Sequence, residues 1–179
     1  MQEPHTAGGA RLTLVLGGAR SGKSRHAQIL AMATPPPWIY IATAQALDDE
    51  MRERVATHKA ERGSGWSTIE EPIELARAVA DAPAQAPLVI DCITFWLSNL
   101  MLGAHDVDSA VARFVRSLDE RKAPTIMVSC EVGAGLVPET PLGRAFRDRA
   151  GFVNQKLAAS AHDVLFMVAG LAMPLKALP

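Results

Sequence analysis

The chain has 179 residues, of which 49% are hydrophobic and 21% are charged, a composition typical of one globular domain with its own core. Its formal net charge of −1 provides no cationic field of the kind that general nucleic-acid-binding proteins carry, so we expect no nucleic-acid partner. No apolar run approaches the ~20 residues of a membrane helix, and residues 1–10 lack a signal peptide's apolar core, so we expect a cytoplasmic protein without a membrane span.

A phosphate-binding loop pattern follows the polar N-terminal extension of residues 1–10. The apolar run Leu12–Leu16 predicts a buried strand, and Ser24–Ala33 predicts the first helix. Between them, GGARSGKS (17–24) matches G-x-x-x-x-G-K-[ST] in the strand–loop–helix context that this pattern requires. Backbone N–H groups of such a loop face an anion, Lys23 reaches the β and γ phosphates, and the Ser24 hydroxyl can hold Mg²⁺. The sequence predicts a nucleoside triphosphate site, against the alternative of a glycine-rich turn without a ligand.

A charged segment after the second strand has two interpretations. The strand is expected at Trp38–Ala42, beyond the stiff turn Pro35–Pro37, and residues 48–62 follow a helical pattern. The segment fits a solvated helix with His58 on its surface. It also fits a helix on which the neutral imidazole of His58 attacks a phosphorus and forms a covalent nucleotidyl intermediate. The spacing of the residues does not decide between the two.

The remaining elements alternate between apolar strands and helices. Strands are expected at Trp66–Ile69, Leu88–Asp91, Thr125–Val128 and Val164–Val168, the last of which should close the sheet. Helices are expected at Ile73–Ala80, Phe95–Leu102, Ser109–Glu120 and Leu142–Ala161. This order predicts an α/β, P-loop NTPase-like fold with a mostly parallel sheet flanked by helices, and we expect residues 11–179 to form a single nucleotide-binding catalytic domain.

Asp91 is the second candidate site residue, because it ends an apolar strand. In phosphate-loop proteins such a carboxylate commonly lies beside the loop and holds Mg²⁺, often through water, together with the loop hydroxyl, here that of Ser24. Many strands also end in an aspartate that only caps a turn. The two cysteines, Cys92 and Cys130, lie in or beside apolar runs and are expected to be buried thiols, since no cysteine and histidine spacing suggests zinc.

Four stretches together resemble one enzyme family, the bifunctional adenosylcobinamide kinase / adenosylcobinamide-phosphate guanylyltransferases of cobalamin biosynthesis. They are GGARSGKSRHAQ (17–28), YIATAQALDDEMRERVATHKAER (40–62), DCITFWLSNL (91–100) and EVGAGLVPETPLGRAFRDRAGFVNQKLAA (131–159). The resemblance implies phosphorylation of adenosylcobinamide by ATP or GTP. It also implies transfer of GMP from GTP to adenosylcobinamide phosphate, which gives adenosyl-GDP-cobinamide and pyrophosphate.

The resemblance also implies roles for particular residues. The pattern DDEM-x-x-R-[IV]-x-x-H-[KR] makes His58 the residue that carries the guanylyl group, whereas His26 and His162 do not fit it. The implied nucleotide contacts are Gly17, Gly18, Ala19, Arg20, Ser21, Gly22, Lys23, Ser24, Ala42, Thr43, Ala44, Lys59, Ala60, Glu61, Arg62, Glu70 and Asp91. The family resemblance further suggests a homo-oligomer, with a trimer as one option.

Three features remain open at this point. The family usually has asparagine where this chain has Cys130, and a thiol cannot replace the paired donor and acceptor of an amide. Arg144 and Asp148 fit an i,i+4 surface pair, or else Arg144 or Arg147 contacts a phosphate of the corrinoid or a neighbouring subunit. The glycine-containing segment 131–138 is expected to be a loop at the lip of the substrate site.

Two alternative functions stay in view. One is another small-molecule kinase of the same fold, with His58 in a structural role. The other is a nucleotide-binding regulatory module, against which the chain has no N-K-x-D motif for reading guanine.

Overall fold

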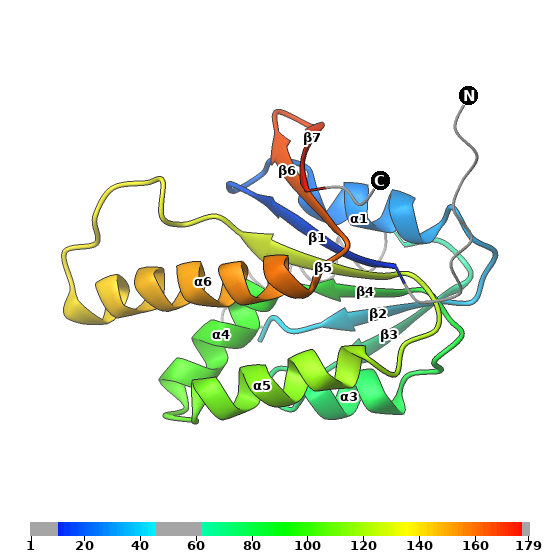
Figure 1. Cartoon of the computed structure of the whole chain (residues 1–179), viewed down its shortest axis with the longest axis horizontal. Helices are drawn as coiled ribbons and strands as arrows, with labels where there is room; N and C mark the ends of the chain where they lie inside the picture. Colours follow the sequence, from blue (N-terminus) through cyan, green and yellow to red (C-terminus); the bar gives the residue numbers. More distant parts are fainter. Residues whose placement is uncertain (1–10, 46–61, 177–179) are drawn as a thin grey trace.

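The structure is a computed structural model that describes residues 11–45 and 62–176. They form a seven-stranded sheet in the order β3-β2-β4-β5-β1-β6-β7, parallel except for the β6–β7 pair (Figure 1). The strands are β1 (Leu12–Gly17), β2 (Trp38–Ala42), β3 (Trp66–Glu70), β4 (Leu88–Asp91), β5 (Thr125–Cys130), β6 (Asp163–Val168) and β7 (Leu171–Lys176). The helices are α1 (Lys23–Ala31), α3 (Leu75–Asp81), α4 (Ile93–Leu102), α5 (Val107–Leu118) and α6 (Pro141–Ser160). The predicted α/β fold with a mostly parallel sheet is confirmed.

Helices cover both faces of the sheet, which explains why the central strands are apolar throughout. In β1, Leu12, Leu14 and Leu16 belong to the larger core cluster, which is shared with α3, α4, α5 and α6. Val15 points to the other face and packs with α1. Successive strand residues face opposite sides of a sheet, so a strand with a helix layer on each side is buried at every position. β1 is accordingly buried along all six of its residues.

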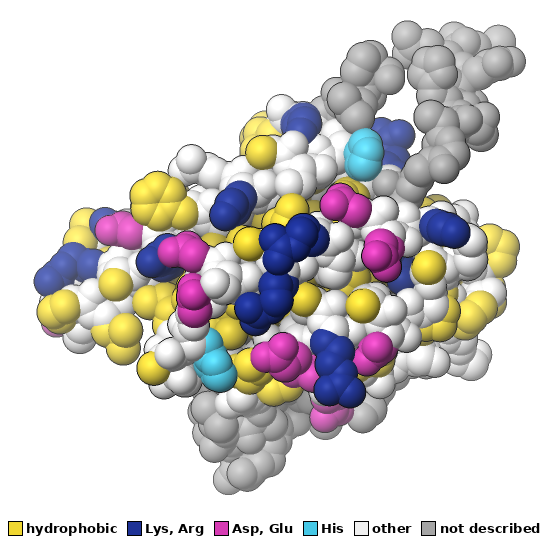
Figure 2. All heavy atoms as spheres, turned by 60° about the horizontal axis from the view of Figure 1, so that its bottom comes forward, with side chains coloured by type: hydrophobic (Ala, Val, Ile, Leu, Met, Phe, Trp, Pro, Cys, Tyr) yellow, Lys and Arg dark blue, Asp and Glu magenta, His cyan; other side chains and the backbone are white. Residues whose placement is uncertain are grey.

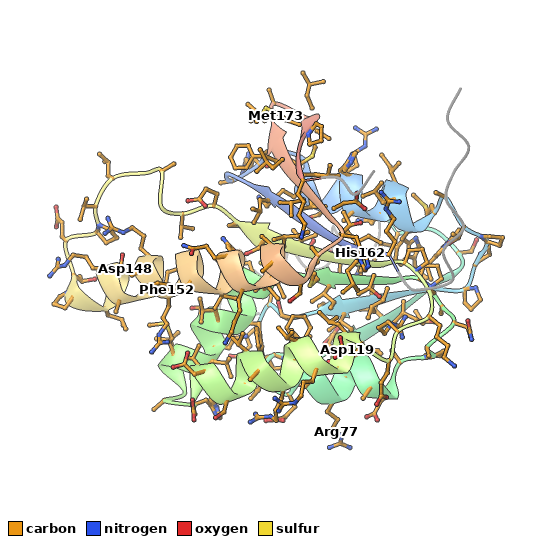
Figure 3. The ribbon with its side chains drawn as sticks, viewed as in Figure 1. Arg77, Asp119, Asp148, Phe152, His162 and Met173 are labelled. Carbon is orange, nitrogen blue, oxygen red and sulfur yellow. The ribbon has the colours of Figure 1, made fainter. Side chains whose placement is uncertain are left out.

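The last strand was missed from the sequence. The expectation that Val164–Val168 closes the sheet is wrong, because β6 is followed by the antiparallel edge strand β7. Residues 171–175 of β7 are all exposed, so β7 lacks the alternation of buried and exposed residues by which a strand is recognised. Pro174 is tolerated because β7 lies at the edge of the sheet, where Figure 3 labels Met173.

The other expected elements that fall on described residues are confirmed, with ends shifted by a few residues. The expected N-terminal extension lies outside the described residues, and so does the expected helix over residues 48–62, apart from Arg62. Among residues 11–45 and 62–176, none of the helices combines the length and the apolar character needed to cross a lipid bilayer.

The end of β7 is joined to the end of α6. Lys176 Nζ donates hydrogen bonds to the carbonyl oxygens of Ala158, Ala159 and Ala161, at 3.0, 3.2 and 2.6 Å. A cation at this position compensates the partial negative charge of the helix C-terminus. Beside it, His162 Nδ1 accepts a hydrogen bond from Leu12 N at 3.0 Å, and Figure 3 shows His162 where α6 leads into β6.

The face formed by α3, α5 and α6 carries charges of both signs. Figure 2 shows lysine and arginine side chains interspersed with aspartate and glutamate over this face, without one continuous cationic area. Some of these side chains form ion pairs, such as Arg149 with Asp108 at 2.7 Å and Arg77 with Asp81 at 3.4 Å. Exposed pairs of this kind contribute little to stability.

Candidate nucleotide-binding site

The glycine-rich loop lies between β1 and α1, at the carboxyl-terminal ends of the parallel strands, which together form the open edge of the sheet where the site lies. Gly22 has φ 95°, in the left-handed region that favours glycine, and it immediately precedes the first residue of α1. At Gly17, an added Cβ would lie 2.6 Å from Met167 O and 2.8 Å from Ser21 Oγ. The first and last glycines of the pattern are therefore required by the packing and the backbone conformation of the loop.

Lys23 is a buried cation for which the described part of the chain supplies no carboxylate. Its side chain is 7% exposed, and Nζ donates a hydrogen bond of 2.6 Å to Gly18 O within the loop. None of the ion pairs among residues 11–45 and 62–176 involves Lys23. The hydroxyl of Ser21 is also buried, and none of residues 11–45 and 62–176 forms a hydrogen bond with it. A buried ammonium group and a buried free hydroxyl in one loop favour an anion that accepts from both.

Asp91 lies at the same edge of the sheet, and its carboxylate has a fixed neighbour. Tyr40 donates a hydrogen bond from its hydroxyl to Asp91 Oδ2 at 2.6 Å. β5 separates β4 from β1, so the ends of these strands lie about 10 Å apart, a gap that side chains and a bound phosphate can bridge. The carboxylate of Asp91 and the hydroxyl of Ser24 are thus available at one edge as oxygen ligands of the kind that Mg²⁺ prefers.

Tyr40 connects two of the predicted site residues, Arg62 and Asp91. Its ring lies under the guanidinium of Arg62, with Arg62 Cζ 4.0 Å from the ring centroid. Through its hydroxyl, Tyr40 also contacts Asp91, and the register of β2 with β4 places Ala42 opposite Asp91. Tyr40 was not singled out from the sequence, because only the pairing of β2 with β4 brings it beside the end of β4.

Burial raises the pKa of the Tyr40 phenol well above its ordinary value, and the neighbouring Asp91 carboxylate adds to the shift. Above pH ~10 the unfolded chain loses this proton while the folded chain keeps it. The contribution of Tyr40 to the free energy of unfolding is therefore fully present below pH ~10 and decreases as the pH rises further. Tyr40 is the only tyrosine of the chain, so ultraviolet absorbance of tyrosinate reports on it alone. We expect tyrosinate to appear together with the loss of folded circular dichroism during alkaline titration. Titration of the native fold with an ordinary tyrosine pKa would contradict this.

Thr43 locks the end of β2 to the start of α4. Its hydroxyl donates to Cys92 O at 2.7 Å and accepts from Cys92 N at 2.8 Å, and Thr43 N donates to Asp91 O at 3.1 Å. Asn99 Nδ2 donates to Thr43 O at 2.8 Å. The side chain of Thr43 is fully buried, so its hydroxyl serves the backbone around Asp91.

Thr43→Val should therefore lower the free energy of unfolding by about 1–3 kcal/mol, since it leaves the buried N–H of Cys92 without its acceptor, whereas Cys92 O keeps a hydrogen bond from Trp96 N at 3.2 Å. Urea denaturation followed by circular dichroism measures the change. The matched control is Thr34→Val, which removes one bond to Ala31 O on a partly exposed threonine and should cost less than about 1 kcal/mol. Equal effects of the two variants would argue against the lock.

The two cysteines differ in environment. Cys92 is 4% exposed, as expected, and its sulfur accepts a hydrogen bond from Phe95 N at 3.4 Å at the start of α4. The expectation of a buried thiol is wrong for Cys130, which is half-buried, because it is the last residue of β5 at the open edge of the sheet. A hydrogen bond between the two thiols raises the pKa of Cys92, and burial raises it further. The same hydrogen bond lowers the pKa of Cys130, with a contribution from the charge of Lys23.

Other predicted site residues are distributed around this edge. Ala44 follows Thr43 beyond the end of β2, and Glu70 ends β3 opposite Ala42. The exposed residues Gly18, Ala19 and Arg20 form the tip of the loop. His58, Lys59, Ala60 and Glu61 lie outside the described residues.

The segment before α6 also borders the site. Glu131 N donates to Gly17 O at 3.0 Å, so this segment leaves the sheet beside the first loop glycine. Leu136 and Val137, at 96% and 64% exposed, show that its middle is open to solvent. Of the two alternatives left open for Arg144, the pair with Asp148 does not form: Arg144 donates to the carbonyl oxygens of Pro138 and Glu139, and Asp148 pairs with Arg147 at 3.2 Å. Arg144 thus holds the loop end against the start of α6.

Comparison with known proteins gives matches along almost the whole chain. The sequence model of the family described as cobinamide kinase / cobinamide phosphate guanyltransferase matches residues 13–175. The chain is 45% identical to the bifunctional adenosylcobalamin biosynthesis protein CobP of Pseudomonas aeruginosa, over 93% of this chain and 98% of that relative. It is 39% identical to the bifunctional adenosylcobalamin biosynthesis protein CobU of Salmonella typhimurium, over 92% of this chain and 99% of that relative.

Solved structures are similar in fold. An ATPase from the type III secretion system of pathogenic bacteria superposes with a TM-score of 0.53 at 10% identity, covering 92% of this chain and 56% of that one. The RadB recombinase superposes with a TM-score of 0.51 at 17% identity, covering 87% and 73%. At such identities the likeness concerns the fold alone.

Proposed function

Because the chain belongs to the cobinamide kinase / cobinamide phosphate guanyltransferase family, we propose that it acts twice on a corrinoid substrate. In the first reaction it phosphorylates the aminopropanol hydroxyl of adenosylcobinamide with ATP or GTP. In the second it transfers GMP from GTP to adenosylcobinamide phosphate and releases adenosyl-GDP-cobinamide and pyrophosphate.

The observation that carries the nucleotide site is the buried charge of Lys23 beside the buried hydroxyl of Ser21, for which the described part of the chain supplies neither a carboxylate nor a hydrogen-bond partner, respectively. A triphosphate supplies the missing anion and also accepts from the backbone N–H groups of the loop. In the kinase reaction the corrinoid hydroxyl oxygen bonds to the γ-phosphorus as the bond to the β–γ bridging oxygen breaks. Lys23 compensates the charge that develops on the phosphate oxygens, and the loop holds the reacting groups in line.

Ser24 and Asp91 are the residues that would hold Mg²⁺, either directly or through water. A hydroxyl and a carboxylate at one sheet edge suit a hard cation, and the hydrogen bond from Tyr40 keeps the Asp91 carboxylate in one orientation. When bound, Mg²⁺ neutralises charge on the β and γ phosphates.

We propose His58 as the nucleophile of the second reaction. An imidazole nitrogen bonds to the α-phosphorus of GTP while the bond to the α–β bridging oxygen breaks and pyrophosphate leaves. An oxygen of adenosylcobinamide phosphate then bonds to that phosphorus as the P–N bond breaks. Dividing the transfer into two displacements lowers the barrier of each. Lys59 and Arg62 compensate triphosphate charge, and Ala42, Thr43, Ala44, Ala60, Glu61 and Glu70 complete the proposed nucleotide contacts.

The proposal is tested by following the corrinoid products. Purified protein is incubated with adenosylcobinamide, Mg²⁺ and either ATP alone or ATP with GTP. The products are separated by chromatography and identified by mass spectrometry. We expect the phosphate with ATP alone and the GDP derivative with both nucleotides. Phosphorylation that never proceeds to the GDP derivative would favour the alternative of another small-molecule kinase. Nucleotide binding without any corrinoid product would favour a regulatory module.

We propose further that residues 11–179 form one domain, because one sheet runs through the described residues. The proposed enzyme works in the cytoplasm, where ATP and GTP are made, and as a homo-oligomer, as the family resemblance implies.

A further inference from the structure

The two cysteines of the chain meet at the base of the phosphate-binding loop. β4 and β5 are paired in parallel with Asp91 opposite Val128, so Cys92 and Cys130 follow this pair by one and two residues. If the parallel pair is continued past Asp91, where β4 ends, with strands ~4.8 Å apart and a rise of ~3.3 Å per residue, an offset of one residue corresponds to about 6 Å between the two α-carbons. That distance falls within the range that disulfides span. Thr94 Oγ1 accepts a hydrogen bond from Cys130 N at 2.6 Å, which independently holds the start of α4 against the end of β5.

The side chains of the two cysteines point to the same face of the sheet. Cys92 packs in the core cluster that contains Val128 and Ala27 of α1. Cys130 follows Val128 by two residues on one strand, and residues two apart in a strand share a face. The two side chains therefore share the face of the sheet that α1 covers.

The two thiols are unequal in access and in charge environment. Cys130 is half-buried at the open edge and lies near the ammonium group of Lys23, whereas Cys92 is enclosed in the core. A neighbouring cation favours the thiolate form, which is the form that reacts with oxidants. Cys130 is therefore the sulfur that meets a small oxidant first, and Cys92 is the sulfur positioned to displace the product.

We propose that Cys92 and Cys130 are a modification site, a pair of thiols that hydrogen peroxide converts into a reversible disulfide within one chain. The Cys130 thiolate attacks one peroxide oxygen; the S–O bond forms, the O–O bond breaks, and hydroxide leaves. The Cys92 sulfur then attacks the sulfenic sulfur; the S–S bond forms, the S–O bond breaks, and the departing hydroxide takes the thiol proton as water. The two sulfur atoms lose two electrons in total, and peroxide gains them. A dithiol reductant reverses the change.

The proposal does not depend on the proposed function, because its test measures only the sulfur atoms. The protein is treated with hydrogen peroxide, quenched with catalase, alkylated in denaturant and digested with trypsin. Arg113, Arg116, Arg121 and Lys122 separate the cysteines, so trypsin places them on different peptides unless a disulfide joins them. We expect one joined pair of peptides, an intact mass lower by two hydrogen atoms, and full recovery of both thiols with dithiothreitol. The chain should migrate as a monomer on a non-reducing denaturing gel.

Two variants test the order of events. In Cys92→Ser the sulfenic acid at Cys130 cannot be displaced, so we expect its dimedone adduct, or sulfinic acid, to accumulate at Cys130. Lys23→Met should slow disulfide formation several-fold, because the charge that favours the thiolate is gone. Its matched control is Lys156→Met, on the exposed side of α6, which should leave the rate unchanged.

Three results would overturn the proposal. They are two intact thiols after peroxide treatment, over-oxidised Cys130 beside a free Cys92 thiol in the wild-type protein, and disulfides that join separate chains only. An equal rate of oxidation in the wild-type and Lys23→Met proteins would remove Lys23 from the mechanism. The wild-type measurement stands even if a variant fails to fold.

Discussion

Replacing His58 with alanine should abolish the covalent guanylyl intermediate. Protein incubated with Mg²⁺ and GTP labelled at the α-phosphorus is expected to retain label through denaturation, and His58→Ala is expected to retain none. Guanylyl transfer to adenosylcobinamide phosphate should fall at least about 10³-fold, because direct transfer lacks the nucleophile that divides the reaction into two displacements. The kinase reaction should lose far less, since Lys23 and the loop carry it.

Two controls show that the retained label is a guanylyl group on His58: the stability of the label in acid and alkali, and its retention in another histidine variant. A phosphoramidate of histidine is labile in acid and stable in alkali, so the label should be lost in acid only. His105→Ala removes an exposed histidine between α4 and α5 and should keep the label. Label that survives in His58→Ala would refute the assignment of the nucleophile. His58 precedes Arg62 by four residues in the sequence, and the Arg62 guanidinium lies over the ring of Tyr40.

Lys23→Met should reduce both reactions together. Each begins with a triphosphate in the same loop, and removal of one preorganised cation from a phosphate site costs about 10²–10³ in kcat/KM, or about 3–4 kcal/mol. Steady-state kinetics of kinase and guanylyl transfer measures the loss. The matched control Lys122→Met removes an exposed lysine before β5 and should change kcat/KM less than about twofold.

The same variant separates binding from folding. Lys23 is buried without a carboxylate among the described residues, so replacing it with a neutral side chain of similar length should not lower the melting temperature measured without nucleotide. In contrast, the increase in melting temperature on adding Mg²⁺ and GTP should shrink or vanish. A variant that binds nucleotide as tightly as the wild-type protein would contradict the role given to Lys23.

The sequence predicted the parts of the site that depend on local order along the chain. An apolar strand, a glycine-rich loop and a helix are consecutive, so the order of residues alone was enough to place Lys23 in the loop directly before the predicted helix, and α1 begins one residue earlier than predicted, at Lys23 itself. Asp91 was expected at the carboxyl end of a strand, and it lies there. Both follow from short-range patterns that tertiary packing does not alter.

Contacts between strands that are far apart in the sequence could not be predicted from such short-range patterns. Cys130 lies opposite Gly17 because β5 pairs with β1, and Tyr40 reaches Asp91 because β2 pairs with β4. Alternation of residues along each strand is equally compatible with other strand orders. Cys130 could therefore be recognised as unusual for the family, but its position between Gly17 and Cys92 could not be foreseen. The edge strand β7 is apolar from Leu171 to Leu175, but no polar residues alternate with the apolar ones and Pro174 interrupts the run, so no strand period marked it.

The final strand has a consequence for any shortened version of this protein. β7 occupies the outer edge of β6, and Pro174 leaves a position on that border without an N–H group for an incoming strand. Lys176 at its end holds the closing carbonyls of α6. A chain that ended before Leu171 would expose the backbone N–H and C=O groups of β6 that now pair with β7. The same deletion would remove the hydrogen bonds of Lys176 to the end of α6. Two such molecules would then be able to join edge to edge, and this self-association would lie next to the phosphate-binding loop, because Gly170 N donates to Ser21 O at 3.1 Å.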